Sequence, residues 1–157
     1  MKKRLFGWSF VVLGVAALFY LLDHITINST PSLPEGIYWK TDTAPKVGDI
    51  VIVPKTALED RFQYPFIPPF LLKTIAAEAP SKIDDSSAGV YINGKYLGPR
   101  PDFRYKYPTL ILYSFHGQLS PGEAWLMNPP ADSFDSRHFG PVSLSDLSKK
   151  VVPLWTF

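Results

Sequence analysis

LFGWSFVVLGVAALFYLL, residues Leu5–Leu22, divides this chain of 157 residues into a short basic start and a long remainder. The stretch contains no charged residue, and Ser9 is its one polar interruption. As a helix rising about 1.5 Å per residue it would measure roughly 27 Å, close to the ~30 Å hydrocarbon core of a bilayer. Trp8 and Tyr20 stand near its two ends, where interfacial aromatic residues are favoured. The stretch therefore predicts a transmembrane anchor.

The charge distribution predicts how this anchor is oriented. The chain has a formal net charge of +2, and Lys2, Lys3 and Arg4 supply three positive charges, so the rest carries 2 − 3 = −1. The positive-inside rule then places residues 1–22, the basic start and anchor, with their N-terminus in the cytoplasm. Residues 23–157 are expected on the other side of the membrane, outside the cytoplasm. A nearly neutral body does not favour nucleic acid as a partner.

Two other interpretations of the apolar stretch are a cleavable signal peptide and a buried helix of a soluble protein. A cleavable signal peptide has a shorter apolar region of about 7–15 residues and an A-x-A-like site, whereas this stretch ends in Leu21-Leu22-Asp23-His24. A buried helix of a soluble protein would show a polar face at helical spacing, and none recurs here. The uncleaved anchor is the favoured interpretation.

Residues 23–157 are expected to form one mainly antiparallel β domain. All 16 prolines lie between Pro31 and Pro153 and interrupt most windows long enough for a helix. Strands are expected at Asp49–Val53, Gly89–Lys95 with an Asn-Gly hairpin turn, Thr109–Tyr113 and Glu123–Met127. Short helical turns are expected at Ser143–Lys150 and at Leu71–Glu78.

Ser32 stands shortly after the anchor in a stretch of restricted backbone. Pro31 and Pro34 fix two backbone angles around it, and Gly36 permits a tight bend. A serine held this rigidly could present its hydroxyl in one orientation. The alternative is an unreactive proline-rich spacer next to the membrane.

A serine hydroxyl is a weak nucleophile and needs a base, for which Lys73 is the candidate. It is the one charged residue in the apolar stretch Phe70–Ala77. Burial disfavours a charged amine and can lower the pKa of a lysine by several units, which would let it accept a proton. The alternative is a surface lysine whose stem lies on apolar neighbours.

A third segment, Asp132–Val142, contains Asp135 and Arg137, which are close enough to pair through charge-assisted hydrogen bonds. The alternative is an ordinary loop with a local ion pair. His24, His116 and His138 are far apart and lack the spacing of a helical zinc site. No glycine-rich phosphate-binding motif occurs, so the sequence predicts no cofactor and no metal.

Five segments, in order along the chain, resemble motifs of the serine–lysine signal peptidases, and most of all their conjugative-transfer (TraF-type) branch. They are Thr30–Tyr38, similar to S-x-P-x-G-[LI]-Y after a transmembrane segment; Gly48–Val51, similar to G-D-x-V; Phe70–Ile75, similar to the apolar-apolar-Lys segment; Val90–Gly94, similar to V-x-V-N-G; and Ser133–Pro141, similar to S-x-D-[SG]-R-aromatic-x-G-P. Each motif alone is weak, but five in order after an apolar helix are a strong resemblance.

The resemblance implies a serine endopeptidase of the signal-peptidase fold that cleaves exported precursors, among them prepilin. It would be anchored in the lipid of the inner membrane, with residues 23–157 in the periplasm. Ser32 would be the nucleophile and Lys73 the base. The Ser32 N–H and the Thr30 hydroxyl would bind the oxyanion, and Asp135 and Arg137 would have a supporting role. The alternatives are a non-catalytic tethered β module of a secretion or pilus complex, and a self-cleaving repressor-type protease, which the anchor disfavours. The aromatic and proline-rich residues 62–70 could line the cleft, rest on the bilayer or pack in the core.

Overall fold

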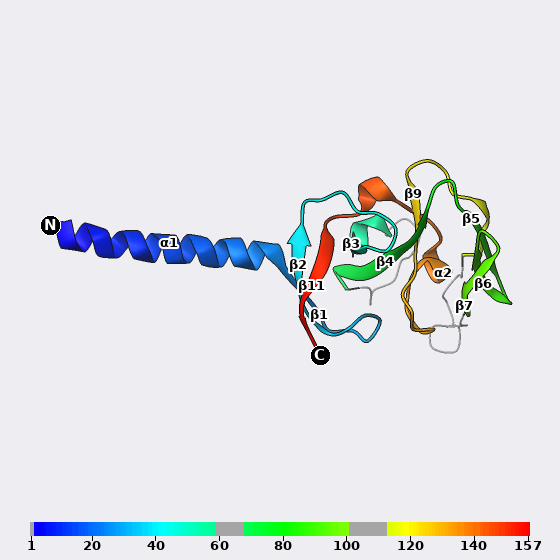
Figure 1. Cartoon of the computed structure of the whole chain (residues 1–157), viewed down its shortest axis with the longest axis horizontal. Coiled ribbons are helices and arrows are strands. Elements are labelled where there is room, and N and C mark those ends of the chain that lie inside the picture. Colours follow the sequence, from blue (N-terminus) through cyan, green and yellow to red (C-terminus); the bar gives the residue numbers. More distant parts are fainter. Residues whose placement is uncertain (1, 59–67, 101–112) are drawn as a thin grey trace.

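The computed structural model describes residues 2–58, 68–100 and 113–157. Helix α1 (Lys2–His24) extends away from a β-rich body, and strand β1 (Ile25–Asn28) follows it directly (Figure 1). Among the residues described, no helix combines the length and the apolar character needed to cross a membrane. The anchor expected at residues 5–22 therefore stays a prediction.

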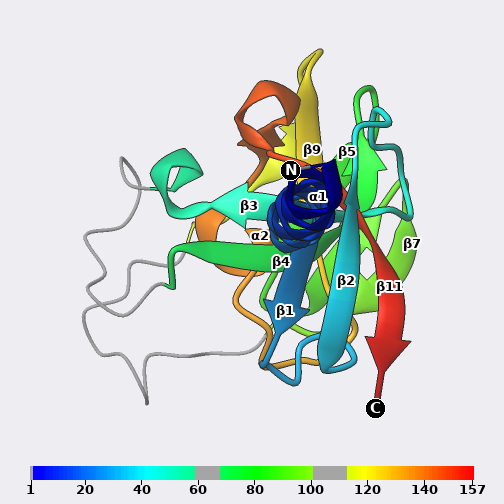
Figure 2. The same ribbon diagram turned by 90° about the vertical axis from the view of Figure 1, so that its left-hand side faces the viewer.

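The body is built on a seven-stranded sheet in the order β1-β2-β11-β3-β4-β9-β10, in which every neighbouring pair is antiparallel. After β1, its strands are β2 (Gly36–Thr41), β3 (Ile50–Pro54), β4 (Phe70–Glu78), β9 (Glu123–Leu126), β10 (Val142–Ser143) and β11 (Lys150–Thr156). Viewed along α1, strands β3 and β4 run across the direction of β2 and β11 (Figure 2). The predicted mainly antiparallel β fold is confirmed.

A second sheet of four antiparallel strands lies at the end of the body remote from α1 (Figure 1). Its order is β7 (Lys95–Gly98), β6 (Gly89–Ile92), β5 (Lys82–Ser86) and β8 (His116–Gln118). The expected hairpin joins β6 to β7, and both turn residues have positive φ, 51° at Asn93 and 80° at Gly94. A two-residue type I′ turn requires positive φ at both positions, which is why Asn-Gly marks it.

Among the described residues, three clusters of buried side chains form the core. The largest packs Val51, Val53, Ile75 and Leu126 of the main sheet against Phe139 of the short helix α2 (Ser136–Phe139). A second joins the two sheets through Trp125. The third packs Leu33 with Tyr38, Ile52, Leu72 and Val151. Leu33 follows Ser32 directly, so this third cluster fixes the loop that carries the serine.

The structure contains most of the helices and strands expected from the sequence and contradicts one of these predictions. Strands β3 and β9 confirm the predictions at Asp49–Val53 and Glu123–Met127. Leu71–Glu78 is not a helical turn but most of β4, because β3 and β9 pair with its two edges. Two 3₁₀ turns complete the described elements, η1 (Lys55–Ala57) and η3 (Leu144–Asp146), and η3 lies within the helical turn expected at Ser143–Lys150.

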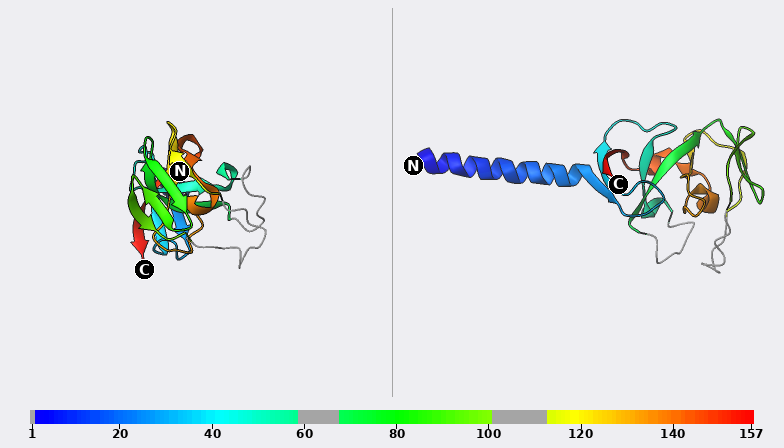
Figure 3. Two further views of the ribbon diagram at one scale, coloured as in Figure 1. Left: turned by 90° about the vertical axis from the view of Figure 1, so that its right-hand side faces the viewer. Right: turned by 60° about the horizontal axis from the view of Figure 1, so that its bottom comes forward.

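Two other expectations fall largely outside the described residues. The strand expected at Thr109–Tyr113 does so except for Tyr113, and the 62–70 segment does so except for residues 68–70. The last described residue, Phe157, lies at the end of the body from which α1 departs (Figure 3).

Candidate active site

Ser32 lies in the loop between β1 and β2, and a buried asparagine holds that loop from the inside. Asn28, only 6% exposed, ends β1 and directs its side-chain amide into the loop. The amide donates hydrogen bonds of 2.9, 2.9 and 3.1 Å to the carbonyl oxygens of Thr30, Leu33 and Pro34. Tyr38 donates a further bond of 2.7 Å from its hydroxyl to the Pro34 carbonyl. The loop is therefore fixed by side chains as well as by its prolines, and Ser32 is left half-buried.

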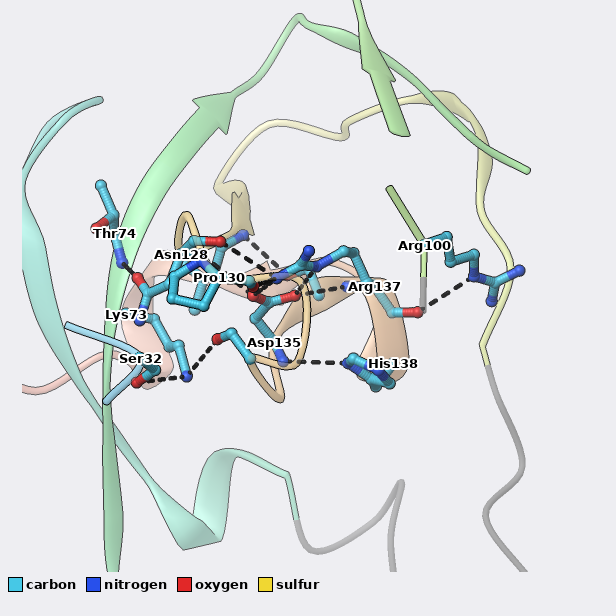
Figure 4. Close-up of polar contacts among 12 residues, drawn as sticks. Ser32, Lys73, Thr74, Arg100, Asn128, Pro130, Asp135, Arg137 and His138 are labelled. Carbon is cyan, nitrogen blue, oxygen red and sulfur yellow. Dashed lines mark hydrogen bonds and ion pairs between the residues drawn. The ribbon is translucent and has the colours of Figure 1, made fainter. Parts of the chain in front are cut away.

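Lys73 of β4 brings its amine to this serine. Its Nζ lies 3.4 Å from Ser32 Oγ and donates a 2.9 Å hydrogen bond to Ser133 Oγ. The Ser32 and Lys73 side chains point toward one another from separate segments (Figure 4). The structure thus brings together two side chains that the sequence separates by 41 positions.

The environment of Lys73 favours the neutral amine. The residue is 3% exposed, and this burial lowers the pKa of Lys73 from 10.5 to about 8. The carboxylates of Asp135 and Asp132 oppose the shift, whereas the guanidinium of Arg137 adds to it. About a tenth of the amine is therefore unprotonated at pH 7 and about half at pH 8, and this neutral form can abstract a proton.

Asn128 holds the backbone of β4 on both sides of Lys73. Its Oδ1 accepts a 2.9 Å bond from the Thr74 amide, and its Nδ2 donates a 3.1 Å bond to the Leu72 carbonyl. Strand β9 ends at Leu126, and the backbone amide of Met127 still donates to the Thr74 carbonyl. The next residue, Asn128, bonds to β4 through its side chain. Neither Asn128 nor Ser133 was predicted as a site residue, because nothing in the nearby sequence indicates that either side chain reaches β4.

Asp135 and Arg137 form a fully buried ion pair behind Lys73. Asp135 caps the N-terminus of α2, and its two oxygens accept from Arg137 Nε at 2.8 Å and Nη2 at 2.7 Å. Arg137 Nη2 also donates to the carbonyls of Asn128 and Pro130, at 3.2 and 2.8 Å. The backbone N–H of Asn128 donates to Asp135 Oδ2 at 3.1 Å. The pair therefore positions the segment that carries Asn128, which in turn holds β4 (Figure 4).

A second ion pair ties the small sheet to α2. Asp85 of β5 is fully buried, and its Oδ1 lies 3.1 Å from Arg100 Nε. Arg100 also donates from Nε to the Arg137 carbonyl at 3.4 Å, and Arg137 Nη1 donates to the Pro99 carbonyl at 3.2 Å. Burial raises the pKa of Asp85 to about 6, although Arg100 opposes the shift. No local pattern in the sequence predicts this pair.

Thr30 lies beside the serine hydroxyl. Its Oγ1 is 3.3 Å from Ser32 Oγ and donates a 2.9 Å bond to Asn28 Oδ1. To donate to an oxyanion formed at Ser32, the hydroxyl hydrogen of Thr30 would have to turn away from Asn28 Oδ1.

The three histidines occupy separate places. His24 stacks on Tyr20 at the end of α1, His116 pairs with Asp84 at 2.8 Å, and His138 lies in α2, where burial lowers its pKa to about 4. Within residues 2–58, 68–100 and 113–157 there is no group of three or more His, Asp or Glu side chains that could hold a metal.

The comparisons with known proteins identify the class to which this site belongs. Residues 3–155 match the family described as signal peptidase, peptidase S26, and the chain belongs to this family. It is therefore a serine peptidase, and the expected TraF-type membership of the signal peptidases is confirmed.

Two relatives are plasmid transfer proteins TraF of Escherichia coli. One is 27% identical over 153 residues, covering 83% of this chain and 82% of its own length, and the other is 26% identical over 166 residues, covering 94% and 93%. The crystal structure of a signal peptidase I from Enterococcus faecalis aligns with a TM-score of 0.44 at 16% identity, covering 71% of this chain and all of that one.

Proposed function

We propose that this chain is a membrane-anchored signal peptidase that cleaves exported precursor proteins with a Ser32–Lys73 dyad. The observation that carries the proposal is the buried Lys73 amine, which lies 3.4 Å from the Ser32 hydroxyl and has a pKa lowered to about 8. A surface lysine on an apolar turn, the alternative considered from the sequence, would be exposed and not 3% accessible.

In the proposed reaction, neutral Lys73 accepts the Ser32 proton while Oγ attacks the scissile carbonyl carbon. The Ser32 N–H and the Thr30 hydroxyl stabilise the negative charge that develops on the carbonyl oxygen. The resulting Lys73 ammonium protonates the leaving amine as the scissile C–N bond breaks, which leaves an acyl group on Ser32. Lys73 then takes a proton from water, the hydroxyl attacks the ester, and Oγ leaves with the proton. Ser133 accepts a hydrogen bond from Nζ and so orients the amine.

The proposed substrate class and location rest on the relatives and on the sequence. Two relatives are named plasmid transfer proteins TraF, and the substrate that we propose from the resemblance to this branch is an exported precursor such as a prepilin. The apolar side chains from Trp8 to Leu22 of α1 are exposed to their surroundings, with the basic residues 2–4 before them. This supports an anchor in the inner membrane with residues 23–157 in the periplasm.

The direct test is Ser32→Ala in the full-length chain, reconstituted with an exported precursor in detergent or vesicles. We expect loss of the cleaved product to background on gels, because alanine has no nucleophilic oxygen. Ser120→Ala is the matched control, since Ser120 is exposed on the loop before β9, and it should process at the wild-type rate. Undiminished cleavage by Ser32→Ala would overturn the proposal.

The pH dependence of the rate provides a second test. Because the pKa of Lys73 is about 8, the fraction of neutral amine rises about tenfold per pH unit well below that value and saturates above it. We expect kcat/KM for a peptide substrate to rise between pH 6 and 8 and to level off near pH 9. A rate that keeps rising beyond pH 10 would contradict a desolvated amine.

Thr30→Val tests the second oxyanion donor. Valine has nearly the shape of threonine but cannot donate, so we expect kcat to fall by roughly 10²–10³ with little change in KM. Single-turnover assays of peptide cleavage measure this loss above the Ser32→Ala background. A wild-type kcat would show that Thr30 only supports the loop through Asn28.

A further inference from the structure

A second feature of the site is a cavity of about 350 Å³ beside Ser32. It is lined by Pro31, Ser32, Leu33, Pro34, Glu35, Pro129, Pro130 and Phe157. Its volume is within the range of roughly 300–1,000 Å³ typical of ligand pockets. Ser32 lines the cavity and Lys73 does not, so the cavity adjoins the serine without lying over the amine. It has no role in the proton transfers proposed above.

The walls of this cavity are held by the same polar groups that hold the site. On one side, the Pro34 carbonyl accepts from Tyr38 and Asn28. On the other, the Pro130 carbonyl accepts from Arg137 at 2.8 Å. The Phe157 amide donates to the Glu35 carbonyl at 3.0 Å and so fixes the third wall. Four proline rings and these bonds make a preformed surface that loses little freedom when a ligand binds.

Among the described residues that line the cavity, Glu35 is the one with a charged side chain. Glu35 is half-buried, and the other lining residues are proline, leucine, phenylalanine and the serine itself. In the part of the chain that the structure describes, no basic side chain forms an ion pair with Glu35. Proline rings next to a carboxylate suit a side chain with a methylene stem and a cationic end.

We propose that this cavity is a substrate subsite that takes a basic side chain within two residues of the scissile bond, with the Glu35 carboxylate as its partner. The lysine or arginine stem would lie against the proline rings, and the cationic group would reach Glu35. This inference rests on the proposed function, because it requires that Ser32 be the residue at which the substrate is cleaved.

The test is a set of otherwise identical peptides carrying Lys, Ala or Glu at each of the two positions on either side of the cut. For the wild-type full-length chain we expect kcat/KM to favour Lys over Glu by about five- to tenfold at one of these positions. Glu35→Gln should remove that preference while the Ala peptide is cleaved as before. Glu35→Lys should reverse it. Asp146→Asn, an exposed carboxylate on η3, is the matched control and should keep the wild-type preference.

The outcomes separate the two proposals. If Glu35→Gln and Glu35→Lys leave every Lys-to-Glu ratio unchanged while all peptides are cleaved, the subsite is wrong and the Ser32–Lys73 proposal stands. If Ser32→Ala cleaves the Ala peptide as well as the wild type does, the proposed function itself fails. A changed ratio at one position in both Glu35 variants, with the control unaltered, supports the subsite.

Discussion

Replacing Lys73 by methionine is expected to abolish precursor cleavage and, at neutral pH, to raise the free energy of unfolding. Methionine is close to lysine in length and suits a site that is 3% exposed, but it cannot accept the Ser32 proton. The loss of cleavage should match that of Ser32→Ala, since a nucleophile and its base act as a unit. Lys73→Arg should be inactive as well, because a guanidinium stays protonated at any pH the protein survives.

The gain in stability follows from the same lowered pKa. A lysine whose pKa is 10.5 when unfolded and about 8 when folded disfavours folding below pH 8 by on the order of 3 kcal/mol, from 2.5 pKa units at 1.36 kcal/mol each. Between pH 8 and 10.5 the unfolded chain binds more protons than the folded one, so the wild-type free energy of unfolding rises with pH. Lys73→Met should lack this rise.

Urea unfolding of the detergent-solubilised chain at pH 7 and pH 10 measures both effects. The matched control is Lys95→Met, an exposed lysine on β7, which should change neither cleavage nor the pH dependence. Active Lys73→Met would remove the lysine from the mechanism. If the free energy of unfolding changes equally with pH in the wild type and in Lys73→Met, the lowered pKa of Lys73 is contradicted. A loss of cleavage would then show only that a lysine is needed at this position.

The features that the sequence predicted well depend on local chemistry. The turn at Asn93-Gly94 requires only two residues with positive φ, and both are adjacent. The position of one cation within an apolar stretch predicts that Lys73 is buried, because such a stretch is buried in a helix or a strand alike. For the same reason the stretch does not show which of the two it forms. A short, mostly apolar run lacks the hydrophobic periodicity that distinguishes a helix from a strand. Here β4 is a strand because it pairs with β3 and β9, which lie elsewhere in the sequence.

The missed residues depend on contacts between distant segments. Asn128 acts on Leu72 and Thr74 across the end of β9, and Ser133 reaches Lys73 only because the chain turns back after Pro130. Asp84 and Asp85 are neighbours in sequence, and alternation along β5 exposes the first and buries the second beside Arg100. The register of β5 with β6 and β8 fixes which of them is inside, and no local pattern reveals that register.

Replacing Arg137 by methionine is expected to destabilise the fold more than any other single substitution at the site. The change leaves the Asp135 carboxylate fully buried without its cation, and breaking such a pair on one side typically costs about 3–5 kcal/mol. It also leaves the Asn128 and Pro130 carbonyls without the donor that Arg137 Nη2 provides. We expect the melting temperature to fall by about 10 °C or more in thermal unfolding followed by circular dichroism.

The double variant Asp135→Asn with Arg137→Met separates the buried charge from the loss of packing. Removing both charges eliminates the unpaired carboxylate, so the double variant should melt above Arg137→Met, although below the wild type because the backbone carbonyls still lack donors. Lys149→Met, which removes the exposed pair with Asp42, is the control and should shift the melting temperature little. A double variant that melts no higher than Arg137→Met would show that the carbonyl contacts, and not the buried charge, account for the stability that Arg137 provides. Cleavage should remain low in the double variant even where it is folded, because Asn128 would no longer be held in the position from which it fixes β4 around Lys73.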